Sequence, residues 1–140
     1  MYKRQEVKLI ESSDPLALAV RPNAILISTA TVKTITTESE LAFLLAHEAA
    51  HHYAKDLERI SDNREKQKAL ELRADANAIK LMQASGYRTQ DAISIVSKLD
   101  KSPMLQSRLA QLQRMTKYHF SSFSYPNRHS RAFQKLKTFL

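Results

Sequence analysis

The sequence of 140 residues contains no cysteine and no tryptophan, and it has a single glycine. Because cysteine is absent, disulfide bonds, thiol catalysis and cysteine-ligated zinc are excluded. Any metal ion must therefore be held by histidine, aspartate or glutamate side chains. No apolar run approaches the ~20 residues that a helix needs to cross a bilayer. The chain is accordingly expected to be soluble.

An intact signal peptide is also absent. The first 15 residues, MYKRQEVKLIESSDP, have basic side chains but neither an apolar core nor a small-residue cleavage site. The expected location is the cytoplasm if the chain is the full product, and periplasmic or extracytoplasmic if a signal or anchor was removed. The length predicts one domain over residues 1–140, with a hydrophobic core of its own.

Acidic residues are missing from the C-terminal part of the chain. Residues 101–140 contain eight Lys or Arg and no Asp or Glu, so the formal net charge of +8 arises entirely in this segment. Such a segment can meet an anionic partner, either a membrane surface or a nucleic acid. The alternative is an ordinary solvated helix face without a partner.

Local patterns predict a small β region followed by helices. Short apolar runs separated by turn residues predict two or three antiparallel strands within residues 5–28. Apolar spacings of three and four residues predict long helices over 37–58 and 63–84. Thr37 with Glu40 fits a capping box at the start of the first of these helices. Further helices are expected within 89–140. The expected fold class is α+β, mainly helical, with a small antiparallel sheet at the N-terminus.

The predicted helix over 37–58 contains the sequence HEAAHH. His47 and His51 are separated by four residues and project from one helix face, where two imidazoles can bind one Zn²⁺ at ~2.0–2.1 Å. Glu48 is rotated by ~100° from His47, which suits it to accept a proton from an attacking water. His52 points away from His51 and is expected to be a bystander. With five histidines and eight glutamates in the chain, about 0.01 matches to this motif are expected by chance, so incidental histidines in a buried helix are the weaker interpretation.

A third ligand is expected from the second long helix, because a catalytic zinc site has three protein ligands and one open position. The sequence ELRAD offers Glu71, 20 residues after His51, and Asp75 one turn later. Asp75 can accept a hydrogen bond from the non-ligating nitrogen of a zinc histidine, which fixes the tautomer. The alternative for both carboxylates is a solvated face with ion pairs to neighbouring Lys and Arg.

A peptidase also needs a hydrogen-bond donor for the developing oxyanion. The candidates are Tyr125, His129 and Arg131, which lie in or just after an aromatic, polar loop before the last predicted helix. His119 begins the same loop and is expected to be polar surface. Nothing in the spacing of these residues selects one of them.

Taken together, these motifs resemble a known family. H-E-x-x-H, E-x-x-A-D and the stretches LMQASGY and DAISIVSKL are similar to the gluzincin zinc metallopeptidases of the HtpX and CAAX-prenyl-protease type, which include the small soluble minigluzincins. LALAV-RPN-AILIS resembles the family's edge strand, tight turn and second strand, and YPNRHSR resembles its closing element. The resemblance covers residues 14 to 137. It implies a zincin-like fold, one Zn²⁺ per chain and a polypeptide substrate.

The resemblance also implies roles for individual residues. His47, His51 and Glu71 would be the zinc ligands, Glu48 the general base, and Asp75 the acid that orients a ligand histidine. An edge strand bordering the active-site helix would pair with an extended substrate, as the unpaired backbone groups of an edge allow. That strand would consist of Leu16, Ala17, Leu18, Ala19 and Val20.

The sequence departs from the family at three positions. Ala50 stands where the family commonly has glycine before the second histidine, and Leu16 with Ala17 replaces a common Asn-Ala. The closing His-Pro is Tyr125-Pro126 here, so Tyr125 is the candidate that replaces the family's histidine. Arg131 follows five residues after the proline, as in the family.

The function expected from these observations is that of a zinc-dependent endopeptidase. A latent form is expected to have the N-terminal strand or the basic C-terminal segment in the cleft. One alternative is a non-catalytic or regulatory binding module that keeps the zincin fold and uses its basic C-terminal surface. A second alternative is an ImmA-like protease that cleaves a repressor, although ASGY…DAISIVSKL favours the first family.

Overall fold

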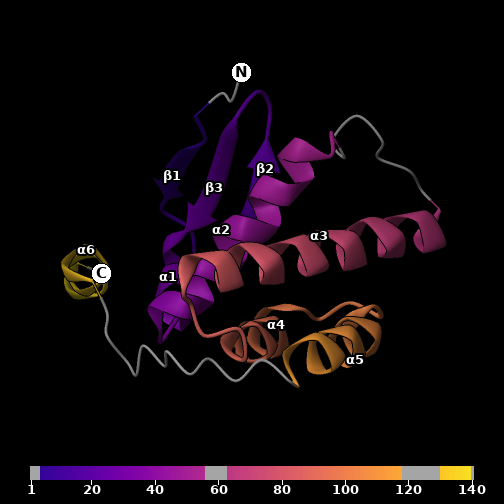
Figure 1. Cartoon of the computed structure of the whole chain (residues 1–140). Helices are drawn as coiled ribbons and strands as arrows, with labels where there is room; N and C mark the ends of the chain where they lie inside the picture. The colour runs from indigo at the N-terminus through magenta and orange to yellow at the C-terminus, as the bar shows by residue number, and fades with distance from the viewer. Residues whose placement is uncertain (1–3, 56–62, 118–129, 140) are drawn as a thin grey trace.

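The computed structural model of the chain describes residues 4–55, 63–117 and 130–139. Within these ranges the architecture is α+β, as predicted, with a three-stranded sheet followed by six helices. The long helix α3 (Arg64–Ser85) crosses the middle of the molecule, with the sheet on one side and two shorter helices on the other (Figure 1). None of the helices in the described ranges is both long and apolar enough to cross a membrane.

The sheet is mixed, which corrects the antiparallel sheet expected from the sequence. Its strands are β1 (Glu6–Ile10), β2 (Ala17–Val20) and β3 (Ala24–Ser28), in the order β1-β3-β2. Strand β2 is antiparallel to β3, whereas β1 is parallel to it.

The parallel pair arises from the path between the first two strands. The connection over residues 11–16 passes the end of β3, where Leu16 O accepts a hydrogen bond from Ser28 N at 2.9 Å. On the same path, Ser12 O accepts one from Ala30 N at 3.2 Å. Strands β1 and β2 therefore run in opposite directions on either side of β3. Because β3 returns antiparallel to β2, it must run parallel to β1.

Helix α2 (Glu38–Tyr53) lies against the edge strand β2 and begins with the capping box that its sequence predicts. The Thr37 side chain accepts a hydrogen bond from Glu40 N, and the Glu40 side chain binds back to the backbone of the cap. The helix is shorter than the predicted range of 37–58, because Ala54 is the C-cap and Lys55 has a left-handed φ of 56°. The end of that predicted range, residues 56–58, lies outside the described residues.

Helix α3 is capped at its start by Asn63, whose side chain accepts hydrogen bonds from the first-turn N–H groups of Glu65 and Lys66. It ends at Gly86, whose left-handed φ of 79° glycine adopts with less strain than a residue with a β-carbon. Helices α2 and α3 are antiparallel neighbours. Residues late in α2 meet residues early in α3, and the backbone of Arg88, just past α3, reaches the Ser39 hydroxyl near the start of α2.

The remaining helices complete the core. Helices α4 (Asp91–Leu99) and α5 (Leu105–Thr116) lie together below α3 in Figure 1. Each of the helices α2, α3, α4 and α5 contributes a fully buried apolar side chain, with 0% exposure, to one cluster. These side chains are Phe43, Ile79, Ile95 and Leu112.

The last helix, α6 (Arg131–Phe139), docks at the far end of α2, beside the short helix α1 (Thr29–Thr34) (Figure 1). The Ser130 backbone N–H and hydroxyl both donate to the Glu38 carboxylate, at 2.7 and 2.8 Å. Lys137 Nζ donates to carbonyl groups at the end of α1, including that of Val32 at 2.8 Å. Phe133 is buried beneath these contacts.

Candidate metal centre in an open cavity

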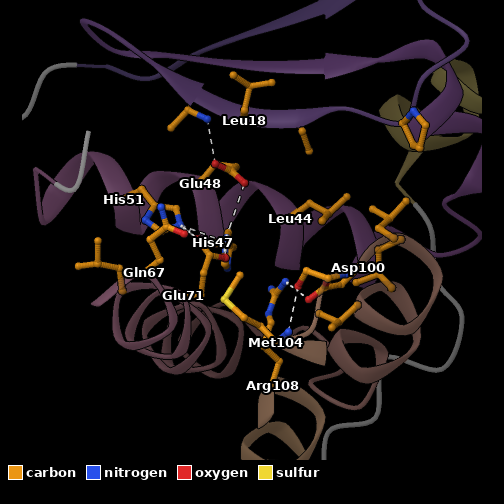
Figure 2. Close-up of a pocket in the computed structure, with 18 residues that line it drawn as sticks. Leu18, Leu44, His47, Glu48, His51, Gln67, Glu71, Asp100, Met104 and Arg108 are labelled. Atoms are coloured by element: carbon orange, nitrogen blue, oxygen red, sulfur yellow. Dashed lines mark hydrogen bonds and ion pairs between the residues drawn. The ribbon is translucent and has the colours of Figure 1, made fainter. Parts of the chain in front are cut away.

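Two histidines of α2 and a glutamate of α3 converge on one point. His47 Nε2 lies 3.1 Å from His51 Nε2 and 3.1 Å from Glu71 Oε2. His51 Nε2 lies 3.0 Å from the other carboxylate oxygen, Glu71 Oε1. The four-residue spacing on α2 and the antiparallel return of α3 together bring these donors into one group (Figure 2).

The donor set suits a transition-metal cation such as zinc. Tetrahedral ligands at ~2.0–2.1 Å from a zinc ion lie about 3.3 Å from one another, close to the separations of 3.0 and 3.1 Å in this group. Two imidazoles and one carboxylate are a ligand set of catalytic zinc sites, which keep the fourth position open. His47, His51 and Glu71 could therefore hold a metal ion.

Asp75 fixes the orientation and tautomer of His47. Its Oδ1 lies 2.7 Å from His47 Nδ1, and Asp75 is fully buried. Because a carboxylate only accepts hydrogen bonds, Nδ1 carries a proton, and Nε2 is the nitrogen that faces the other two donors and would bind a cation. This arrangement is the one that a metal-binding imidazole requires.

The electrostatics of the three donors favour a positive charge among them. Burial lowers the pKa of His47, but its hydrogen bonds with Asp75 and Glu71 outweigh burial and raise that pKa to about 10. Burial likewise opposes ionisation of Glu71, yet its contacts with His47 and His51 hold its pKa well below the usual range. A proton can supply the positive charge that this site attracts, and so can a divalent cation.

Glu48 lies beside the donors without joining them. Its Oε1 is 3.9 Å from His47 Nε2, and its Oε2 accepts a hydrogen bond from the backbone N–H of Ala19 in β2 at 2.8 Å (Figure 2). Burial raises the pKa of the Glu48 carboxyl. One oxygen is thus tied to the edge strand while the other faces the candidate metal centre.

The group opens into a cavity of about 640 Å³. Strand β2 forms one wall with Leu18, α2 contributes Leu44, and the start of α5 with the turn before it contributes Met104 (Figure 2). Among the described residues, neither β1 nor α6 lines this cavity. The latent form expected from the sequence stays a prediction, because part of the basic segment 101–140 lies outside the described residues.

Arg108 is a cavity residue that the sequence interpretation missed. Its Nε and Nη2 donate to the two oxygens of Asp75, both at 2.8 Å, and its Nη1 donates to Asp100 at 3.2 Å. The sequence did contain an indication that Arg108 has a buried partner. Arg108 lies on the apolar face of α5 formed by Leu105, Leu109 and Leu112, where a charged residue needs a buried partner.

His52 does not belong to the donor group, and its side chain instead joins α2 to the sheet. Its Nε2 lies 2.8 Å from the carbonyl oxygen of Ala24, which fastens α2 to β3. The expected edge strand is observed as β2, which begins at Ala17. Leu16 precedes it, and its backbone N–H donates to the Ser28 hydroxyl at 2.9 Å.

Three of the candidate loop residues, His119, Tyr125 and His129, lie outside the described residues. Arg131 is the first residue of α6, where it is exposed and does not line the cavity. Its neighbour Ser130 binds Glu38, the first residue of α2. Glu38 and His47 are nine positions apart on α2, or about 13.5 Å along the helix.

The basic segment is described only in part. Within it, Arg114 on α5 and Arg131 and Lys135 on α6 are exposed to solvent. The two helices lie on different sides of the molecule in Figure 1. An anionic partner for residues 101–140 stays a prediction.

The fold and the donor group define an α+β protein with a candidate metal centre beside a carboxylate, in a cavity bordered by an edge strand. The peptidase U49 family matches residues 26–139, most of the chain, and the chain therefore belongs to this peptidase family. The matched range contains His47, Glu48, His51, Glu71 and Arg108, and it begins after β2. No curated protein matches the chain. The narrower resemblance to the HtpX and CAAX-prenyl-protease type stays a prediction.

Proposed function

We propose that the protein is a zinc-dependent endopeptidase that hydrolyses peptide bonds of an extended polypeptide. The observation that carries this proposal is the convergence of His47, His51 and Glu71 within 3.1 Å of one another, with Glu48 beside them, in a member of a peptidase family. One zinc ion per chain would be held by these three side chains. Bound there, it would supply Lewis-acid polarisation of the scissile carbonyl and of a water molecule.

Glu48 is the proposed general base. Its Oε1 faces the donor group, so it can accept a proton from the attacking water and deliver it to the leaving amine. Its raised pKa, which burial causes, makes the carboxylate a stronger base than an exposed glutamate. Its position one residue after His47 turns it toward β2 rather than toward Glu71.

Strand β2 is the proposed binding edge for the substrate backbone. In an antiparallel pair, the N–H and C=O of one residue point to the same side, and the direction alternates along the strand. Because Ala19 N–H points to Glu48, Ala19 and Ala17 direct their backbone groups away from β3. The C=O of Ala19 and the N–H and C=O of Ala17 are therefore the groups proposed to bind the substrate. An extended peptide can add to such an edge as a further strand.

The charges of the cavity argue against the C-terminal carboxylate of a peptide as the bound group. Arg108 is the only Lys or Arg among the described residues that line it, and it is already paired with Asp75 and Asp100. It is therefore not available to bind a C-terminal carboxylate. For the oxyanion, Tyr125 stays the proposed donor, since Arg131 starts α6 and does not line the cavity.

Zinc content and casein hydrolysis test the proposal when both are measured on the same samples. The wild type should hold about one zinc per chain and cleave unfolded casein. Glu48→Gln should keep the zinc and lose activity by about 10²–10⁴-fold. Glu65→Gln, an exposed position on α3, is the matched control and should behave as wild type.

Each negative result has a distinct meaning. A wild-type protein that binds no zinc contradicts the metal part of the proposal. Casein cleavage that persists in Glu48→Gln, with zinc retained, contradicts the assignment of Glu48 as the base.

A further inference from the structure

Arg108 contacts the candidate metal centre through a chain of buried side chains. Its guanidinium binds both oxygens of Asp75, and Asp75 Oδ1 also meets His47 Nδ1 at 2.7 Å. The Arg108 side chain is 12% exposed and Asp75 is completely buried, so solvent does not replace either partner easily. The elements involved, α5, α3 and α2, are distant in sequence and meet only in the folded chain.

We propose that Arg108 is a positioning residue of the metal centre, which holds Asp75 so that His47 presents Nε2 to the cation. This inference rests on the proposed function, because it requires that the His47, His51 and Glu71 group binds a metal ion. Arg108 does not touch the three donors or the reacting atoms. It acts through Asp75 alone.

The geometry of the guanidinium supports a positioning role. Two parallel N–H···O bonds at 2.8 Å fix the plane of the Asp75 carboxylate, which a single contact leaves free to rotate. The orientation of that carboxylate in turn sets the direction of the His47 ring, because Oδ1 is the acceptor for Nδ1–H. Lysine carries the same charge but cannot form the two-pronged contact.

Asp100 gives Arg108 a second anchor. The C-cap residue of α4, Asp100, accepts from Arg108 Nη1 at 3.2 Å, and its Oδ1 accepts from the backbone N–H of Ser102 at 2.7 Å. Both carboxylates that Arg108 contacts are therefore fixed by a further hydrogen bond. The contact with Asp100 holds the guanidinium beside the cavity, where Figure 2 shows Asp100 and Arg108 together.

Zinc affinity of the folded, metal-free protein, measured by competition with a chromophoric chelator, tests this role without any assay of activity. Arg108→Ala should weaken zinc binding about tenfold, at the lower end of what loss of an orienting partner costs. The zinc affinity of Arg108→Lys should lie between those of Arg108→Ala and wild type, because lysine keeps the positive charge but cannot form the bidentate contact with Asp75. Arg114→Ala removes an exposed arginine from the same helix and should bind zinc as wild type does.

Thermal unfolding of the metal-free variants separates positioning from simple stabilisation. A purely structural arginine would lower the melting temperature while leaving zinc affinity unchanged in the folded state. That result would overturn the inference and leave the proposed function intact, whereas a wild type without zinc affinity would defeat both. If Arg108→Ala does not fold, Arg108→Lys decides alone, and wild-type affinity in that variant overturns the inference.

Discussion

Glu48 Oε2 accepts a hydrogen bond of 2.8 Å from the backbone N–H of Ala19, which joins helix α2 to the edge strand β2. The bond leaves Oε1 of the same carboxylate facing His47 at 3.9 Å. The strand proposed to bind the substrate thus also orients the proposed general base. Substrate binding and proton transfer would share one short element, β2 (Ala17–Val20).

Ala19→Pro removes the N–H group that donates a hydrogen bond to Glu48. This variant should have a lower kcat, with little change in zinc content. Proline is tolerated on an edge strand where its nitrogen faces away from the partner strand, as at this position. Loss of an orienting hydrogen bond to a catalytic group is expected to cost about tenfold in kcat, or about 1.4 kcal/mol. Steady-state kinetics on a fluorogenic peptide gives the value.

Ala17→Pro is the matched control for that variant. Ala17 shares the free edge with Ala19, but its backbone makes no contact with Glu48. Its substitution should raise KM, because one backbone group for the substrate is lost, and leave kcat close to wild type. Equal kcat values in the two variants would show that β2 does not orient Glu48.

Glu71→Gln should reduce the zinc content of the purified protein after dialysis. The amide keeps the shape of the side chain but loses the negative charge that faces His47 and His51 at 3.1 and 3.0 Å. Zinc affinity should fall by at least about tenfold, because the loss of a direct ligand weakens metal binding no less than the loss of an orienting partner. Elemental analysis of the dialysed protein, alongside Glu65→Gln on the same helix, gives the comparison. Undiminished zinc in Glu71→Gln would make Glu71 a structural residue.

The sequence predicted the parts of the site that depend on local spacing. His47 and His51 share a face of α2 because a helix repeats every 3.6 residues. Glu71 and Asp75 are also four residues apart and share a face of α3 for the same reason. The structure then brings the two helices together as expected, with the four side chains in contact. The capping box at the start of α2 is likewise local, and it is confirmed.

Features that depend on distant contacts were not predicted. The apolar face of α5 marks Arg108 as a charge that needs a buried partner, but it does not identify Asp75, 33 residues away, as that partner. His52 likewise meets Ala24 across 28 residues, through packing that no local pattern contains. The parallel pairing of β1 with β3 depends on the path of residues 11–16 past the end of the sheet. An isolated strand pattern carries no information about such a path.

Added zinc should raise the thermal stability of the metal-free protein. A ligand present at 100 times its dissociation constant stabilises the folded state by about 2.7 kcal/mol, or about 5–10 °C in melting temperature for a chain of this size. Differential scanning calorimetry with and without zinc gives the shift, and an excess of chelator should reverse it. An equal shift in Glu71→Gln would place the zinc outside the proposed centre.

The stability of the fold in acid should depend on Glu40, a buried residue of α2 that lies seven positions before His47. Its carboxylate accepts hydrogen bonds from Thr36 and Ser94 and an ion-paired hydrogen bond from Lys98 at 2.9 Å. Burial alone would raise the pKa of Glu40, but these partners lower it from 4.5 to about 2. Because the folded state holds this proton less tightly than the unfolded state, ionised Glu40 stabilises the fold at neutral pH.

That contribution is fully present above pH 4.5, the ordinary value, and is lost as the pH falls toward 2. It amounts to about 3 kcal/mol, from the size of the pKa shift. Urea unfolding at pH 7 should find Glu40→Gln less stable than wild type by about this amount, and the gap should narrow at pH 3. Glu65→Gln, at an exposed position, should show neither effect. A deficit in Glu40→Gln that stays constant between pH 7 and pH 3 would mean that the side chain stabilises the fold through its shape rather than its charge.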